Sequence, residues 1–342
     1  MQQPYFARLR RTAVAAICGL AAAMCGATAV AGDRYTYTTI TPPVGASSVT
    51  ALGVNEHSTV FGTYTDANGN SPGFLLNHEV FTTISPPQAT YGTFVVAVNI
   101  FRTVAGNYFD TNFNQFGFVL QGKTYTTINP PTAVNGSHIN AMNNFGAIGG
   151  YAFDANFNLH GFVYFWGRYI AVEPPGSVLS QVTGISDDGT VVGNYNKADG
   201  ISHGFVLKNG TYTTIDAPAP AVSTQIVGID DEGTIAGTWA DTLNVVHGFV
   251  LGGKTFTTIQ PTGATSTIVG AIGLDGTVVG GYTDAGSVEH GFVYDDGVVT
   301  TIDPPGAVGF TFVLGVNLSG MIVGNYDDAN TNSQAFIGIP KK

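Results

Sequence analysis

The chain has 342 residues and a net charge of −11, but only 10% of its side chains are charged, and 46 residues are glycine. This acidic balance excludes a surface for a phosphate backbone, which needs concentrated Lys and Arg, so we expect no nucleic-acid partner. Low charge combined with many glycines and many β-forming residues favours short strands and tight turns.

Residues 1–31 have the pattern of a secretory signal peptide. Three arginines precede an alanine-rich apolar run, residues 12–31, which ends in the small-residue pattern Ala29-Val30-Ala31. An uncleaved membrane anchor is the alternative, because the run is about 20 residues long. Cleavage would remove the three arginines and both cysteines, which takes the net charge from −11 to −14 and leaves no thiol. We therefore expect a secreted, periplasmic or cell-surface protein with no membrane span after signal cleavage.

The remaining residues, 32–342, form one domain built from a repeat of 43–44 residues. The motif Thr-Thr-Ile ends at Ile40, Ile84, Ile128, Ile215, Ile259 and Ile302, with Val172 as a degenerate copy. A Gly-Phe pair places its phenylalanine at Phe74, Phe118, Phe162, Phe205, Phe249 and Phe292, and Ala335-Phe336 is the seventh copy. Two motifs in the same register predict seven copies of one structural unit.

Each repeat contains four short β-type segments. In the fourth repeat these are Val182–Ser186, Thr190–Tyr195, Gly204–Leu207 and Tyr212–Ile215. Asn209-Gly210 predicts a two-residue hairpin between the last two segments. Four strands per repeat and seven repeats predict an all-β fold, a seven-bladed β-propeller with four antiparallel strands per blade. A solenoid is the alternative, but its end repeats would have to be polar caps.

The two ends of the domain predict how the ring closes. The first segment, Tyr35–Ile40, is a lone Thr-Thr-Ile strand, and the last strand, near Ile339, has no Thr-Thr-Ile after it. We expect the N-terminal strand to join the C-terminal blade, which would remove the open sheet edge that invites aggregation. A closed ring of this kind is expected to be a monomer.

Two residue classes fit a propeller. The seven phenylalanines are expected to pack between blades, where two sheet faces meet. Small residues recur in the first strand of each repeat, where strands would crowd toward the axis: Gly53, Ala97, Ala141, Gly184, Gly228, Ala271 and Gly315.

The Thr-Thr-Ile, Gly-x-x-x-Gly-x-Tyr and His-Gly-Phe segments together resemble the bacterial extracellular HAF repeat. The tripeptide stands at His160-Gly161-Phe162, His203-Gly204-Phe205, His247-Gly248-Phe249 and His290-Gly291-Phe292. The resemblance covers residues 32–342 and implies an extracellular, propeller-like repeat protein. It implies no particular activity.

An aromatic residue near the end of each second strand is the main candidate for ligand binding. The seven are Tyr64, Tyr108, Tyr151, Tyr195, Trp239, Tyr282 and Tyr326. They precede the longest loops of the repeat. We expect these loops, together with the Pro-Pro connections, to lie on the face of the propeller that binds a ligand. Aromatic rings stack on sugars, and a ring of weak sites would suit a multivalent lectin. The alternative is that these residues pack inside the blades.

The loops that follow are weak calcium candidates. Asp66, Asp110, Asp154 and Asp328 each begin an Asp-x-Asn-x-Asn sequence, which offers alternating oxygen ligands. No later Glu completes a calcium loop, and Asp and Asn also initiate turns by bonding to their own backbone. His160, His203, His247 and His290 could bind a metal, or could be repeat-structural.

The sequence contains no nucleophile–base–orienter set, and its carboxylates are distributed evenly by the repeat. We therefore expect no catalytic residues and no cofactor other than the candidate calcium. The predicted function is that of a non-enzymatic binding module for extracellular glycan or protein. One alternative is a polysaccharide lyase or hydrolase on a propeller scaffold, which predicts two carboxylates within about 5–10 Å. A purely structural envelope protein is the other.

Overall fold

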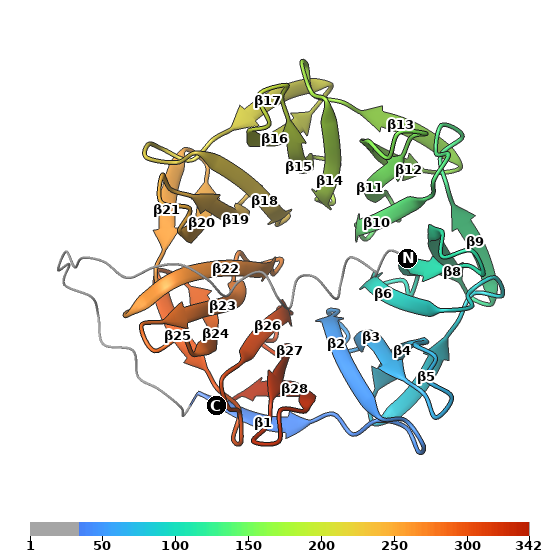
Figure 1. Ribbon diagram of the computed structural model, residues 1–342, viewed down its shortest axis with the longest axis vertical. Coiled ribbons are helices and arrows are strands. Elements are labelled where there is room, and N and C mark those ends of the chain that lie inside the picture. The colour runs from blue at the N-terminus through green and yellow to red at the C-terminus, as the bar shows by residue number, and fades with distance from the viewer. Residues whose placement is uncertain (1–33, 342) are drawn as a thin grey trace.

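The computed structural model describes residues 34–341, which form 28 strands in seven four-stranded antiparallel sheets arranged in a ring (Figure 1). This confirms the predicted seven-bladed β-propeller. In the described part of the chain no helix is long and apolar enough to cross a bilayer. The signal peptide predicted for residues 1–31 lies outside the described residues.

Each blade takes its strands in chain order from the axis outward, except that the closing blade takes its outer strand from the start of the domain. Blade 1 holds β2 (Ser48–Val54), β3 (Val60–Thr65), β4 (Gly73–Asn77) and β5 (Val80–Ile84), and blade 2 holds β6 (Gly92–Val98), β7 (Val104–Phe109), β8 (Gln115–Gln121) and β9 (Thr124–Ile128). Blade 3 holds β10 (Ser137–Met142), β11 (Ile148–Phe153), β12 (Leu159–Phe165) and β13 (Arg168–Val172), and blade 4 holds β14 (Leu179–Ile185), β15 (Val191–Asn196), β16 (Ser202–Lys208) and β17 (Thr211–Ile215). Blade 5 holds β18 (Ser223–Ile229), β19 (Ile235–Ala240), β20 (Val246–Gly252) and β21 (Thr255–Ile259), and blade 6 holds β22 (Ala264–Ile272), β23 (Val278–Asp284), β24 (Glu289–Asp295) and β25 (Val298–Ile302). Blade 7 holds β26 (Thr311–Val316), β27 (Ile322–Asp327), β28 (Ser333–Pro340) and β1 (Tyr35–Thr39).

The repeated phenylalanines form the core between blades, as predicted. All seven are at most 3% exposed. Phe74 of blade 1, for example, shares a buried cluster with Met321 and Val323 of blade 7. Each blade therefore completes the core of its neighbour, because an apolar sheet face must be covered by a second layer.

The innermost strands crowd at the axis, and this explains their small residues. A Cβ atom on Gly315 would lie 2.9 Å from the Cα atom of Gly53 in the next blade. Every innermost strand also carries a β-bulge, an extra residue that re-aims a side chain. The bulged positions are Leu52, Val96, Asn140, Thr183, Val227, Gly270 and Leu314, and all seven line the axial channel.

The predicted closure is confirmed. β1 pairs with β28, with Tyr35 opposite Pro340 and Thr39 opposite Phe336. The pairing extends at both ends, because Ile40 N donates to the carbonyl of Ala335 and the backbone N–H of Lys341 donates to the carbonyl of Arg34.

Buried asparagines join three of the blades to the next one. In each case the side-chain amide accepts from a backbone N–H and donates to the carbonyl of the same residue on the neighbouring innermost strand. The pairs are Asn107 with Ile139, Asn194 with Ile226 and Asn325 with Ala51. The last pair links blade 7 to blade 1 and reinforces the closure.

Candidate functional site

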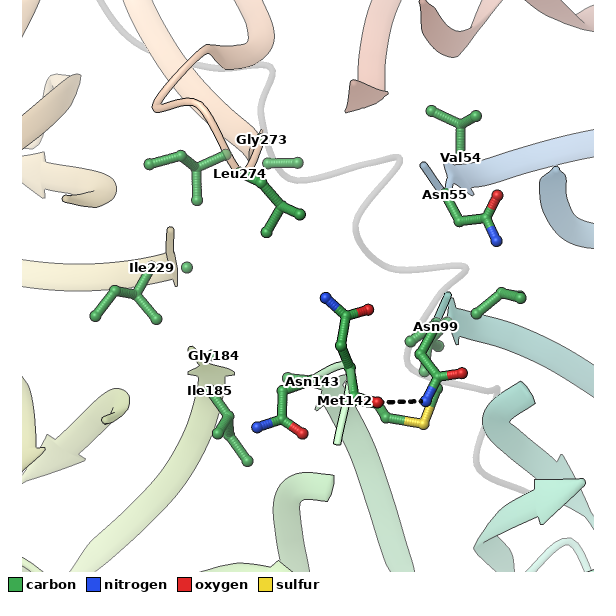
Figure 2. A pocket seen from close by; sticks show the side chains of 18 of the residues that line it. Val54, Asn55, Asn99, Met142, Asn143, Gly184, Ile185, Ile229, Gly273 and Leu274 are labelled. Atoms are coloured by element: carbon green, nitrogen blue, oxygen red, sulfur yellow. Dashed lines mark hydrogen bonds between the residues drawn. The ribbon is translucent and has the colours of Figure 1, made fainter. Parts of the chain in front are cut away.

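A cavity of about 390 Å³ lies on the propeller axis, where the turns between first and second strands meet. Figure 2 shows Val54, Asn99, Met142, Ile185 and Leu274 around this opening. Because all seven blades contribute equivalent residues, the cavity is the mouth of the central channel, and we call it the axial mouth.

The wall of the axial mouth combines aliphatic side chains with amides and carboxylates. Its apolar part comes from the apolar bulged residues, Leu52, Val96, Val227 and Leu314, and from the last residue of each innermost strand, such as Val98 and Ile229. Its polar part is spread over blades 1 to 5 and includes Asn55, Glu56, Asn99, Asn140, Asn144, Asp187 and Asp231. A concave wall that combines apolar side chains with convergent polar groups is a composition found in ligand sites.

Hydrogen bonds between turns fix the polar rim. The N–H of Asn144 donates to Oδ1 of Asp187 at 2.8 Å, and its side-chain Nδ2 donates to Oδ2 at 2.9 Å. The N–H of Asp187 donates in turn to Oδ1 of Asp231 on the next blade at 2.8 Å. The N–H of Leu318 donates to Glu56 across the closure at 2.9 Å. These contacts order the rim before any ligand arrives.

The rim is acidic. Glu56, Asp187 and Asp231 all line the opening. Burial raises the pKa of the Glu56 carboxyl above its ordinary value, and the N–H of Leu318 opposes that shift. Since each carboxylate already accepts a hydrogen bond, the rim suits a neutral or positively charged group better than an anion.

The axial mouth lies at the opposite end of the blades from the face that the loop lengths favoured. The long loops follow the second strands and the outer strands, whereas the mouth is formed by the short turns that begin with Asn55, Asn99 and Asn143. The face that the loop lengths predict to bind is therefore not the face that carries this cavity, because the inner strands converge at the other end.

Most of the aromatic residues proposed as a ligand-binding ring are packed within the blades, which is the alternative that the sequence left open. Tyr108, Tyr195, Tyr282 and Tyr326 are buried, while Tyr64 and Trp239 are half-buried. Five tyrosine hydroxyls bond at 2.8–3.1 Å to the second Thr of the Thr-Thr-Ile strand in their own blade, in the pairs Tyr64–Thr83, Tyr108–Thr127, Tyr195–Thr214, Tyr282–Thr301 and Tyr326–Thr39. These tyrosines therefore recur because each one links the second strand of its blade to the outermost strand by a hydrogen bond.

Tyr151 does not belong to this set. It pairs with Gly161, whereas Tyr108 and Tyr282 pair with the residue before the glycine. The equivalent position in blade 3 is Ala152, which is buried. Blade 3 also differs in its outer strand, because Ala171 stands where five other blades have the second Thr that bonds to the tyrosine hydroxyl. The signal was present in the sequence: the aromatic precedes the core phenylalanine by ten residues in six repeats and by eleven at Tyr151.

The Asp-x-Asn-x-Asn loops have the turn geometry that was the alternative to calcium binding. Oδ1 of Asp66, Asp110, Asp154 and Asp328 accepts the N–H of each of the next two asparagines, and Oδ2 accepts the Nδ2 of the second. The pKa of Asp154 is lowered to about 2, and the main cause is the hydrogen bond from the side chain of Asn158. Because the second Asn turns its amide N–H groups toward the carboxylate, its oxygen does not converge on the same point.

The histidines of the His-Gly-Phe segments connect these loops to the outer strands. His290 lies between Asp284, at 3.4 Å from Nε2, and Asp303, at 2.8 Å from Nδ1. Blade 5 has Gln260 in the place of Asp303, and blade 7 has Gln334 in the place of the histidine. A neutral glutamine replaces a charged or titratable partner in these two blades, which indicates that the contacts are structural. Within residues 34–341 no group of three His, Cys, Asp or Glu side chains could hold a metal ion.

His138 is a polar residue that the sequence did not single out. Its ring stacks on Tyr151 with centroids 5.1 Å apart, and Nδ1 lies 2.6 Å from Nε2 of Gln115 in blade 2. An amide N–H can donate to Nδ1 only while the ring is neutral there. Burial lowers the pKa of His138 to about 4, so the ring is neutral at physiological pH.

Acidification is expected to destabilise the protein through His138. The unfolded chain binds a proton near pH 6.5 and the folded chain only near pH 4, so stability is present above pH 6.5 and is lost as the pH falls. Between pH 7.5 and 4.5 this residue should remove about 2.5 kcal/mol from the free energy of unfolding. The test variant is His138→Gln, because blades 4 and 5 have glutamine at this position, as Gln181 and Gln225. Urea unfolding of this variant at the two pH values should not show the loss of stability. An equal pH dependence in both proteins would contradict the assignment.

Comparisons with known proteins confirm the fold. No protein-family model and no curated protein matches the chain. The β-propeller domain of the Trilobed protease from Pyrococcus furiosus is 13% identical with a TM-score of 0.59, over 86% of this chain and 98% of that one. That domain is described as having an open Velcro topology, whereas here β1 and β28 close the ring.

Two further solved structures are similar at lower coverage or score. A prolyl endopeptidase is 11% identical with a TM-score of 0.61 over 90% of this chain, which spans half of that enzyme's length. A variant of the Aleuria aurantia lectin in complex with Fucα1-6GlcNAc is 12% identical with a TM-score of 0.44, over 78% of this chain and 98% of that one. At these identities the likenesses to the protease propeller domain and to the prolyl endopeptidase show a β-propeller fold and no activity.

Proposed function

We propose that the protein is a non-enzymatic binding module that captures an extracellular glycan or protein partner at the axial mouth. The signal-peptide pattern and the resemblance to the HAF repeat support an extracellular location. The ordered polar rim around the axial cavity supports binding at this place, because its groups are fixed in advance and a ligand does not have to order them.

The rim also supports a role without catalysis. Asp187, Asp231 and Glu56 each accept backbone N–H groups from the neighbouring turn, so they serve the joints between blades. The ligand at such a rim is a neutral sugar or a segment that presents an amine or a guanidinium.

Filling the axial mouth should abolish binding there. Leu274 lines the cavity and is half-buried, so Leu274→Trp places a large ring in the opening. We expect at least about a tenfold loss of affinity for a ligand found on a glycan array or by pull-down of extracellular proteins. Val44→Trp is the matched control, because Val44 is fully exposed in the connection at the other end of blade 1. No ligand from either screen, or equal binding by Leu274→Trp, would remove the support for this site.

Asp231→Asn separates the two classes of ligand. The substitution removes one negative charge and keeps an oxygen that can accept the N–H of Asp187. A cationic segment should bind more weakly to the variant and with a smaller dependence on salt, whereas a neutral sugar should bind unchanged.

A further inference from the structure

Two phenylalanines stand exposed on the face opposite the axial mouth. Phe113 and Phe157 occupy the same position in the loops between second and third strands of blades 2 and 3, and their exposed fractions are 66% and 65%. The φ angles of these residues are +61° and +63°, in the left-handed region. The other five loops place small or polar residues at this position: Gly69, Gly200, Asn244, Ser287 and Thr331.

The left-handed conformation makes phenylalanine an unfavourable choice at this position. Its Cβ atom crowds the backbone there, while glycine adopts the same angles without that crowding. Exposure gives no compensating burial of the ring. Strained residues that persist in a fold are concentrated at binding sites, so both rings are candidates for contact with a ligand.

A second aromatic ring enlarges the surface on blade 2. Tyr91, in the connection that precedes β6, stacks on Phe113 with centroids 3.9 Å apart and planes inclined by 16°. Tyr91 is itself 49% exposed, so the pair presents a wide aromatic surface. On blade 3, Phe157 leans on Phe153, which packs edge-on against Tyr151.

The residues around these rings are polar and uncharged, except for two carboxylates that already accept hydrogen bonds. Asn112, Asn114 and Asn156 lie in the same two loops and are exposed. Asp110 and Asp154 accept hydrogen bonds from their own loops. His138 and Gln115 link the two blades below the loops. Flat rings with an amide rim match a ligand that has apolar ring faces and many hydroxyl groups.

We propose that Tyr91, Phe113 and Phe157 form a shelf on which a neutral glycan chain stacks across blades 2 and 3. Separate, fixed rings among amides fit successive sugar rings better than they fit a continuous apolar peptide face. The acidic protein disfavours a polyanionic chain at the same surface. The shelf goes beyond the axial mouth, because it is a second site at the other end of the blades and names one class of ligand.

The test is native affinity electrophoresis of the protein in gels containing hydroxyethyl cellulose, galactomannan or dextran. At least one of these neutral polysaccharides should retard the protein relative to a gel without polysaccharide. Phe113→Gly combined with Phe157→Gly removes both rings and suits the left-handed angles, so the melting temperature should not fall while affinity falls on the order of tenfold. Ser287→Gly is the matched control, since it changes the same loop position without removing a ring.

Retardation of the double variant equal to that of the unchanged protein would overturn the proposal, as would retardation in none of the three gels. Retardation by alginate alone, a polyanion, would also overturn it. A double variant that melts well below the unchanged protein would show that the rings serve stability, and this result would also overturn the proposal. Retardation that Leu274→Trp abolishes and the double variant keeps would belong to the axial mouth and would overturn the shelf, so the two sites can fail independently.

Discussion

Replacing Phe205 with alanine is expected to lower the free energy of unfolding by about 3–5 kcal/mol. The ring is fully buried and shares a cluster with Val163 and Val172 of blade 3. It also lies against Gly193, where a Cβ atom would come within 2.8 Å of it. The cavity left by the substitution cannot collapse, because each wall belongs to a sheet held by its own hydrogen bonds. Urea unfolding followed by tryptophan fluorescence measures the loss.

Two controls show whether the loss comes from packing between blades. Phe205→Leu keeps most of the volume and should cost less than about 1.5 kcal/mol. Phe145→Ala removes an exposed ring and should change stability by less than about 0.5 kcal/mol. If Phe205→Ala cost no more than Phe145→Ala, the core between blades 3 and 4 would have been misplaced.

Asn194→Leu is expected to cost about 1–3 kcal/mol, because it leaves the buried N–H group of Ile226 without a partner and removes one of the two hydrogen bonds to its carbonyl, the other coming from Oγ1 of Thr183. Oδ1 of Asn194 accepts from that N–H at 2.6 Å, and Nδ2 donates to that carbonyl at 2.9 Å. Leucine has a similar size but can make neither bond, so the effect is one of unsatisfied polar groups.

Asn196→Ala is the matched control on the same strand. Asn196 is more exposed and makes one long bond, 3.3 Å to the carbonyl of Gly200. Its loss should cost less than about 1 kcal/mol. Similar losses for Asn194→Leu and Asn196→Ala in urea unfolding would mean that the bonds between blades 4 and 5 contribute little.

The ring could be predicted from the sequence because each repeat carries local and periodic signals. The left-handed pair Asn209-Gly210 formed the predicted hairpin, and the half repeat at Tyr35–Ile40 found its partner in the last strand. These predictions needed only turn chemistry, strand periodicity and the count of motifs. The pairing of β1 with β28 followed because an unpaired edge is unfavourable.

The candidate site was less accessible, since it depends on which residues meet across strands and blades. Burial of Tyr108 follows from its partner Thr127, which is 19 residues away and two strands further out. The axial mouth needs one residue from each of seven repeats, and the β-bulges that turn Asn140 and Thr183 into the channel leave no motif. Phe113 and Phe157 could not be recognised from the sequence, because a single aromatic residue in a loop belongs to no periodic pattern. Only the backbone φ angle shows that these residues are strained.

The pairing of β1 with β28 has a consequence for the order of folding. It joins segments at opposite ends of the described chain, and the bond between Thr39 and Tyr326 spans 287 residues. During synthesis β1 emerges before all the other described strands and β28 emerges after them, so blade 7 cannot be complete until the strands of the other six blades have been synthesised. Joining residues 34 and 341 and opening the chain between blades 3 and 4 would give a circular permutant in which blade 7 is local. That permutant should close its ring from a different pair of blades while keeping the same folded structure.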